Sequence, residues 1–106
     1  MVKQGDIIKL DFSPTKGHEQ SGYRPAVVVS NNFAISKTNM VYVAPITSTT
    51  RSFPLHVALD SRTTTSGDIL CEQIKAVDLA ARHFSIVESL PDDLLEKVLT
   101  RIISCF

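Results

Sequence analysis

The stretch GHEQSGYRPAVVVS occupies residues 17–30 and joins a polar loop to an apolar strand. Its first part, residues 17–22, is polar and bounded by glycines, which is typical of a loop. Pro25 then begins the run Ala26-Val27-Val28-Val29. This run is β-branched and too short for a helix, so it predicts a strand buried in the interior of a sheet.

Shorter strand-like segments flank this stretch on both sides. Residues 7–12 alternate apolar Ile8, Leu10 and Phe12 with polar residues, which predicts a half-buried strand. Residues 41–46 predict a strand that ends at Pro45, because proline is tolerated mainly at strand ends or edges. Residues 55–59 alternate again, residues 60–68 are turn material, and residues 69–77 predict one further strand.

Helical signals are few and concentrate at the end of the chain. Asn31 and Asn32 are suited to cap a short helical turn through residues 33–35, and residues 78–82 suit one more turn. Pro91, Asp92 and Asp93 suit the first turn of a full helix. Its apolar stripe follows the helical period: Leu94, Leu95, Val98, Leu99, Ile102 and Ile103.

Several short strands followed by one amphipathic helix predict a mainly β chain of the α+β class, a small barrel or sandwich. The 106 residues contain 43% hydrophobic and 21% charged residues, as ordinary globular proteins do. No repeat or linker divides the sequence, so residues 1–106 are expected to form a single domain. A chain this small leaves much surface exposed, which makes dimerisation unsurprising.

The charge and the cysteine content exclude few classes of function, but they bear on the cellular compartment. The formal net charge is zero, with nine Lys/Arg against seven Asp/Glu in residues 1–82 and two against four in residues 83–106. Cys71 and Cys105 are far apart in sequence and suggest neither a disulfide framework nor a zinc site. With no apolar N-terminal segment and no membrane-spanning run, we expect a soluble cytoplasmic protein.

The sequence carries no phosphate-binding glycine loop, dinucleotide fingerprint or cluster of metal ligands. Two polar loops remain, residues 17–25 and residues 45–51, which supply a guanidinium and several hydroxyls. RNA cleavage needs only such groups, because RNA carries its own 2′-OH nucleophile and the enzyme supplies proton transfer and anion stabilisation. By composition alone, however, an arginine before a strand is usually a surface ion-pair partner and a Ser/Thr run is usually a solvated turn.

Taken in order, these loops match a family. Residues 5–7 and 17–30, then Pro45-Ile46-Thr47-Ser48, then residues 69–78 and the C-terminal amphipathic helix closely resemble the MazF/PemK (Kid, ChpB-like) toxins of type II toxin–antitoxin systems. The likeness covers essentially the whole chain. It implies an SH3-like β-barrel of the CcdB/PemK-like toxin fold. It also implies a sequence-specific endoribonuclease (mRNA interferase) that needs no metal or cofactor and leaves 2′,3′-cyclic phosphate and 5′-OH ends.

The resemblance also assigns residues. Arg24 matches the family's catalytic arginine and Thr47 its catalytic threonine. Further active-site or RNA-binding candidates are Lys16, His18, Glu19, Gln20, Ser48, Thr49, Arg51, Glu72 and Gln73. In the PemK-like branch an arginine stands two residues before the acid, where this sequence has Leu70. That departure favours the Arg24/Thr47 arrangement over an Arg/acid pair.

The resemblance implies single-stranded RNA as substrate, a cognate antitoxin as inhibitor and a homodimer, with DNA reached only indirectly through an antitoxin complex and no membrane partner. Tyr23 and Phe53 are suited to stack on unpaired bases or to cover the core. Two alternatives stay open. A CcdB-like toxin shares the fold but poisons gyrase through a C-terminal tryptophan, and this chain has no Trp. The second is a non-catalytic SH3-like binding module.

Overall fold

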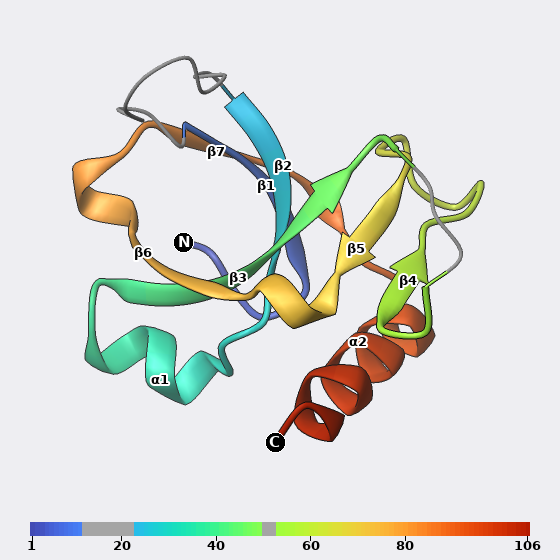
Figure 1. Ribbon diagram of the computed structural model, residues 1–106. Helices are drawn as coiled ribbons and strands as arrows, with labels where there is room; N and C mark the ends of the chain where they lie inside the picture. Colours follow the sequence, from blue (N-terminus) through green and yellow to red (C-terminus); the bar gives the residue numbers. More distant parts are fainter. Residues whose placement is uncertain (12–22, 50–52) are drawn as a thin grey trace, which may run out of the picture.

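The computed structural model describes residues 1–11, 23–49 and 53–106 (Figure 1). In chain order the elements are β1 (Asp6–Asp11), β2 (Tyr23–Val28), α1 (Asn32–Lys37), β3 (Met40–Thr47), β4 (His56–Ala58), β5 (Asp68–Leu70), the 3-10 helix η1 (Cys71–Gln73), β6 (Lys75–Asp78), the 3-10 helix η2 (Leu79–Ala81), β7 (Phe84–Ser89) and α2 (Asp92–Ser104). The predicted mixture of many short strands with a C-terminal helix is confirmed.

The strands form one seven-stranded antiparallel sheet in the order β4-β5-β3-β2-β1-β7, with β6 paired to β3. β3 lies at its centre. It pairs with β2 on one side, and on the other side with β6 at its start and β5 at its end. Among the described strands, β4 and β7 end the sheet without pairing to each other, so it curls without closing (Figure 1).

The predicted end of the third strand at Pro45 is wrong, because β3 continues to Thr47. Pro45 keeps a partner, Ala26, on the β2 side. On the other side, pairing with β6 stops at Val43 and pairing with β5 resumes at Ile46. Proline lacks the N–H that a strand donates, so it fits where β3 changes from one neighbour to the next.

The predicted continuous strand over residues 69–77 is also wrong, again because β3 changes neighbours around Pro45. The chain forms β5, leaves the sheet as η1, and returns as β6. These two strands pair with opposite ends of β3, so η1 spans the stretch of β3 around Pro45 where neither is paired. Cys71 of η1 is buried, and its burial raises the pKa of the thiol to about 11.

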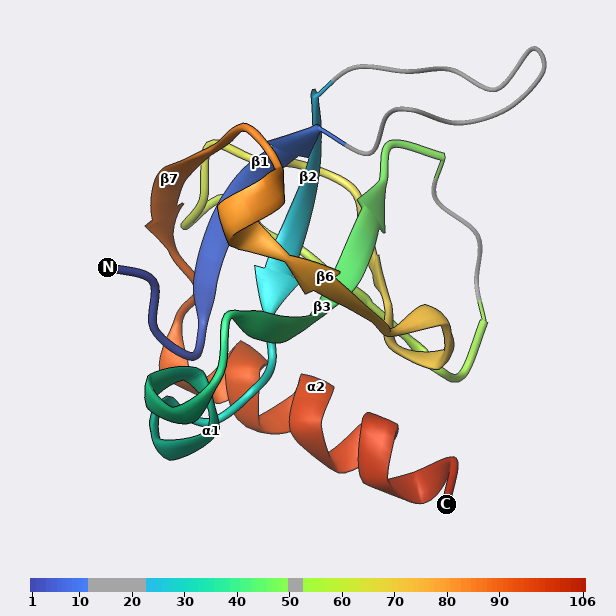
Figure 2. The same ribbon diagram turned by 90° about the vertical axis from the view of Figure 1, so that its left-hand side faces the viewer.

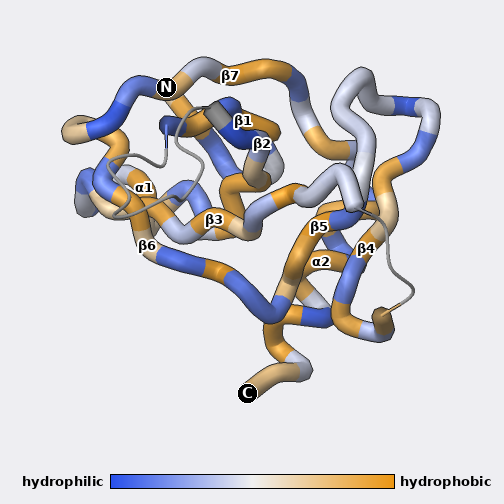
Figure 3. Tube along the Cα trace, turned by 45° about the horizontal axis from the view of Figure 1, so that its top comes forward, coloured by the Kyte–Doolittle hydropathy of each residue, from blue (hydrophilic) through white to orange (hydrophobic). Residues whose placement is uncertain are grey.

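β7 was not predicted. It is an edge strand paired with β1 through a register shift between Ile7 and Ile8. Five of its six residues are exposed, Phe84, Ile86 and Val87 among them, so its side chains show no alternation of buried and exposed positions. Figure 3 shows this apolar stretch of β7 at the rim of the molecule. Its apolar residues face solvent rather than a core, so a sequence pattern does not reveal this strand.

Two cores lie on opposite faces of the central strands. Ile7, Val27 and Ala44 pack in the first, together with Leu94 and Val98 of α2. The alternate residues of the same strands pack in the second, which comprises Val2, Ile8, Leu10, Ala26, Val28, Val41, Val43, Val77 and Leu79. Because both faces of β2 are buried, its residues Ala26, Val27 and Val28 form an apolar run rather than an alternating pattern.

The helices follow their sequence signals. Asn31 caps α1, since its Oδ1 accepts a hydrogen bond from the Ala34 N–H at 2.8 Å. Asp92 and Asp93 occupy the first turn of α2, with Pro91 as N-cap, and the apolar stripe of α2 faces the first core. Figure 2 shows α2 lying along one side of the sheet. Of the helices in the described residues, none is long and apolar enough to cross a membrane.

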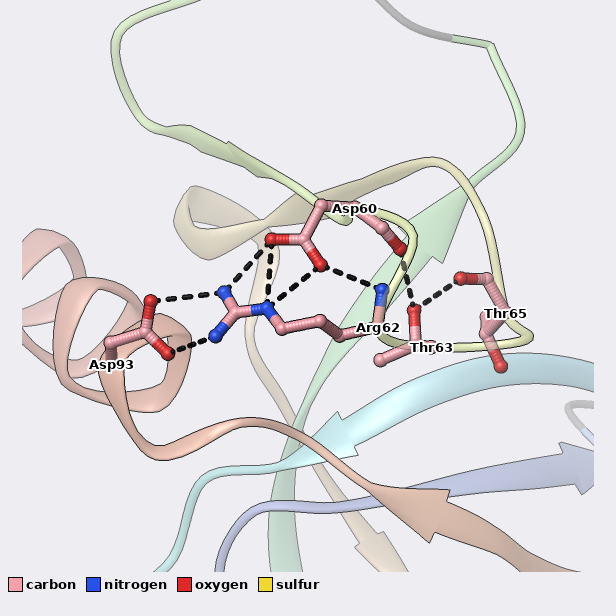
Figure 4. Close-up of polar contacts among 5 residues, drawn as sticks. All are labelled: Asp60, Arg62, Thr63, Thr65 and Asp93. Atoms are coloured by element: carbon pink, nitrogen blue, oxygen red, sulfur yellow. Dashed lines mark hydrogen bonds and ion pairs between the residues drawn. The ribbon is translucent and has the colours of Figure 1, made fainter.

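Side-chain contacts hold the loop between β4 and β5 in place at two points. Arg62 binds Asp60 at 2.8 Å and reaches Asp93 of α2, also at 2.8 Å (Figure 4). Glu88 of β7 accepts hydrogen bonds from the backbone N–H and the hydroxyl of both Thr64 and Thr65, at 2.8–3.0 Å. These contacts fix the entry to β5, which carries part of the candidate site.

Candidate active site

Arg24 and Thr47 lie at the same end of neighbouring strands. Arg24 is the second residue of β2 and is exposed, whereas Thr47 is the last residue of β3 and is half-buried. The register between the strands pairs Ala26 with Pro45, and two further residues along each strand reach Arg24 and Thr47. The pairing therefore brings together the two residues that the resemblance names as catalytic.

The two side chains also share a face of the sheet. Side chains two residues apart on a strand point the same way. Arg24 therefore shares its face with Ala26 and Val28, and Thr47 shares its face with Val43 and Val41; all four partners belong to the second core. Beyond the edge of that core, this face presents a guanidinium and a hydroxyl together.

Thr47 is held by its neighbours. Its Oγ1 accepts a hydrogen bond from the Thr49 N–H at 3.2 Å, and its Cα partner on β5 is Asp68. A hydroxyl offers one donor besides its acceptor positions, so Thr47 is oriented, and within residues 1–11, 23–49 and 53–106 its O–H donates no hydrogen bond to another residue. Directly after it, Ser48 and Thr49 are exposed at the end of β3.

Further along the same face lies a group of ionisable side chains. Asp68 is buried, and its carboxylate lies 3.9 Å from His56 Nδ1. His56 Nε2 lies 3.0 Å from Glu72 Oε2. His56, in β4, has only 12% of its side chain exposed. Asp68 and His56 therefore connect Thr47 to Glu72 across three elements of the fold.

Glu72 is an ionised acceptor in this group. Partial burial favours its neutral form, but its own backbone N–H, the His56 hydrogen bond and the His56 charge together hold the pKa of the carboxyl below its usual value. Gln73, which is exposed, places its Nε2 at 3.4 Å from Glu72 Oε2. Glu72 and Gln73 are therefore in contact at the surface.

The structure brings together part of the predicted set. Arg24, Thr47, Ser48 and Thr49 meet at one end of the β2–β3 pair, and Glu72 and Gln73 project from η1 toward β4. Five other candidates, Lys16, His18, Glu19, Gln20 and Arg51, lie outside the described residues. Leu70, where the PemK-like branch has its arginine, is half-buried opposite His56.

Sequence reasoning missed His56 and Asp68 as site residues. His56 looked like the outward residue of an alternating strand, and Asp68 looked like the end of a turn. No local signal separates His56 from the outward residue of an alternating strand, because its partners Asp68 and Glu72 come from β5 and η1. In the described part of the chain, no group of three or more His, Cys, Asp and Glu side chains is arranged to hold a metal ion.

Comparison with known proteins identifies the family. The protein-family model described as "PemK-like, MazF-like toxin of type II toxin-antitoxin system" matches residues 3–106 of this chain. The chain belongs to this toxin family. It is 41% identical over 78 residues to the endoribonuclease toxin MazF of Escherichia coli strain K12, covering 74% of this chain and 69% of the relative.

Two further relatives extend the likeness of this PemK/MazF-like toxin over almost its whole length. Endoribonuclease PemK of Escherichia coli is 31% identical over 105 residues, covering 95% of this chain and 79% of PemK. The crystal structure of MazE-MazF (Form-II) from Deinococcus radiodurans superposes with a TM-score of 0.88 at 30% identity, covering 98% and 94% of the two chains. Both of these Escherichia coli relatives are endoribonucleases, and this toxin belongs to the same class of enzyme.

Proposed function

We propose that this toxin cuts single-stranded RNA in a metal-independent reaction at Arg24 and Thr47, and that a cognate antitoxin blocks it. The RNA supplies the nucleophile. Its 2′-oxygen attacks the adjacent phosphorus, the bond to the 5′-oxygen breaks, and the products carry a 2′,3′-cyclic phosphate and a 5′-OH. The observation that carries the proposal is the shared face and shared strand end of Arg24 and Thr47.

Each residue has a role that its chemistry permits. A guanidinium presents several N–H donors in a fixed plane, so Arg24 binds the non-bridging oxygens and stabilises the charge of the phosphorane. The O–H of Thr47, oriented by the bond from Thr49, donates to the scissile phosphate. The departing 5′-oxygen takes its proton from Arg24 or from a water that Arg24 orients.

The proton of the 2′-OH needs an acceptor, and a guanidinium cannot take it because it is already protonated and has no acceptor site. One carboxylate lies directly opposite Thr47 on the face that Thr47 shares, that of Asp68 on β5. Glu19 is a second candidate, outside the described residues. We assign the acid and stabilising roles to Arg24 and leave the base to one of these carboxylates.

The partners follow from the same proposal. Solved relatives include a MazE-MazF complex from Deinococcus radiodurans, and an endoribonuclease in complex with its cognate antitoxin from a mycobacterial species. We propose an antitoxin here too, laid over the RNA-binding face, with DNA contacted only through that complex. We further propose a homodimer as the form that binds RNA.

The experiment is a digest of a long single-stranded RNA in excess EDTA, with cut positions mapped by sequencing. The wild type is expected to cut at one recurrent short word and leave cyclic-phosphate and 5′-OH ends. Arg24→Ala is expected to cut nothing while keeping its fold and its binding to antitoxin. Lys97→Ala removes one positive charge from the exposed side of α2 and serves as the matched control.

Unchanged cutting by Arg24→Ala would remove Arg24 from the mechanism. Loss of cutting in EDTA that returns with a divalent metal would overturn the metal-independent reaction. A folded wild type that cuts no RNA would leave the non-catalytic binding module as the better description of the chain.

A further inference from the structure

Four side chains form a compact group at the surface beside the Thr47 end of the sheet. The Phe53 ring lies 4.9 Å from the His56 ring, centroid to centroid, with the two planes inclined by 57°. His56 Nε2 is 3.0 Å from Glu72 Oε2, and Gln73 Nε2 is 3.4 Å from the same oxygen. Phe53 is 46% exposed, so its ring presents an open edge or face to solvent.

This group lies on the same face of the sheet as Thr47. Thr47 pairs with Asp68, and His56 pairs with Leu70, two residues further along β5. Cross-strand partners share a face, and so do residues two apart, so Thr47, Asp68, Leu70 and His56 all point the same way. Ile46, Val57 and Ile69, which alternate with them, face the first core instead.

The spacing suits a chain of nucleotides. Two residues along a strand advance about 7 Å, and each step to the neighbouring strand adds about 5 Å. The path from Thr47 to His56 crosses two strand spacings, about 10 Å, and runs two residues along the strand, about 7 Å at right angles to them, so His56 lies about 12 Å from Thr47. That distance is too far to touch the same phosphate but close enough to face a base next to it or one further along. The group is thus placed to contact the RNA away from the bond that is cut.

The hydrogen bonds determine what the group accepts. Among the described residues, the side-chain hydrogen bonds to Glu72 converge on Oε2, so this oxygen is held and none of these bonds occupies Oε1. The carboxyl is ionised, since its pKa lies below its usual value through the N–H and His56 interactions that outweigh its partial burial. An ionised carboxylate can only accept hydrogen bonds.

Bases differ in what they offer such an acceptor. Adenine, cytosine and guanine each carry an exocyclic amino group that donates to a carboxylate. Uracil has a single N–H, flanked by two carbonyl oxygens that a carboxylate repels. The exposed Phe53 ring adds a surface on which an unpaired base of any kind can stack. Stacking therefore gives affinity, and Glu72 gives discrimination against uracil.

We propose that Phe53, His56, Glu72 and Gln73 form a base subsite of the ribonuclease, which selects a base with an exocyclic amino group over uracil at one position beside the cut. His56 is a positioning residue in this subsite, because it holds the Glu72 carboxylate. The proposal rests on the proposed RNA cleavage for its substrate, but base selection is measured separately from cutting.

The test compares short RNAs that differ only in the base at one position near the mapped cut, with all four bases at each position in turn. Wild type is expected to prefer the amino-bearing bases over uracil by roughly tenfold at one position, the worth of one hydrogen bond to a charged group. Glu72→Gln is expected to lose that preference, since an amide also pairs with uracil, while it still cuts.

His56 is tested by a graded pair of variants. His56→Ala is expected to weaken the selection, because the Glu72 carboxylate is no longer held. His56→Gln is expected to restore most of it, because its amide N–H again donates to Glu72. His83→Gln changes an exposed histidine outside the group and is the control. A merely structural role of His56 would lower cutting of all RNAs equally and leave the base preference intact.

Failure of this subsite is distinct from failure of the ribonuclease. Cutting by Glu72→Gln with the wild-type base preference at every position would overturn the subsite and leave the enzyme standing. If the wild type cuts nothing, fluorescence anisotropy with 2′-deoxy oligonucleotides, which lack the nucleophile, measures the same base preference in binding. No difference between wild type and Glu72→Gln there would also overturn the subsite.

Discussion

Gly67 lies against the backbone of Thr47 so closely that a β-carbon at position 67 would overlap the Thr47 carbonyl group. Gly67 also has a φ of +123°, in the region that residues with side chains rarely adopt. It directly precedes Asp68, the β5 partner of Thr47. The end of β3 that carries the candidate catalytic hydroxyl is therefore packed against a residue that only glycine suits.

Gly67→Ala is expected to damage cutting more than it damages folding. The methyl group must push the Thr47 backbone away, which moves the hydroxyl from its place beside Arg24. The strained φ is expected to cost about 1–3 kcal/mol of the free energy of unfolding. The checks are urea unfolding and the cleavage rate under conditions where the variant is fully folded.

Gly5→Ala provides the matched control. Gly5 also has a positive φ, +93°, but its β-carbon would meet the side chain of Leu95, 3.1 Å away, and no part of Thr47. It is expected to lose similar stability and to keep the wild-type cleavage rate per folded molecule. Equal losses of cleavage in both glycine variants would show that strain, rather than the position of Thr47, limits the reaction.

Thr47→Val removes the hydroxyl and keeps the shape and the preference for a strand. We expect its fold and stability to stay close to wild type and its cleavage rate to fall by about 10²-fold or more, as for loss of one donor to a transition-state oxygen. Thr47→Ser keeps the hydroxyl and is expected to retain most of the rate. A valine variant with the wild-type rate would exclude the hydroxyl from the reaction.

Much of the fold and of the candidate site was predictable because its signals are local. The β-branched run within β2, the Asn31 cap and the period of α2 each depend on neighbours in sequence. Arg24 and Thr47 came from motifs on two strands that pair with each other. Their proximity therefore required only the correct sheet.

What was missed depends on contacts between distant segments. β7 is held by the β1 backbone and shows no alternation, and the break between β5 and β6 follows from Pro45 on another strand. His56 belongs to the candidate site only because Glu72, on η1 directly after β5, lies within hydrogen-bond distance of it. None of these partners is visible in the residues adjacent to the missed ones.

Glu88 is expected to make stability depend on pH in the acid range. Burial favours its neutral form, but hydrogen bonds from Thr65 and Thr64 outweigh burial and hold the pKa of Glu88 below its usual value, 4.5. A depressed pKa in the folded state contributes stability that is fully present above pH 4.5 and is lost as the pH falls through the folded value.

Glu88→Gln is therefore expected to be less stable than wild type at pH 7, by about 1–3 kcal/mol for the loss of charged acceptors. The gap is expected to close as the pH falls below 4.5, measured by urea unfolding at each pH. Glu96→Gln, an exposed carboxyl on α2, is the control and is expected to shift little. A gap of constant size down to pH 2 would show that the charge of Glu88 does not stabilise the loop.

The surface between α1, β3 and α2 is where we expect a second copy of the chain to bind. Tyr42 is 52% exposed and Ile103 71% exposed, and both line one groove with Val29, Ala34, Ile74, Leu99 and Ile102. Phe33 and Phe106 are also largely exposed. Contiguous exposed apolar surface of this kind marks a protein interface, and the predicted dimer supplies a partner with the same surface.

Ile103→Asp is expected to turn the dimer into a monomer at micromolar concentration, because it places a charge in an apolar interface. Light scattering measures the mass of wild type and variant. Thr100→Asp adds the same charge to another exposed position of α2, outside this groove, and is expected to leave the dimer intact. A monomeric wild type would count against the dimer itself, whereas a dimeric Ile103→Asp variant would place the interface on another surface.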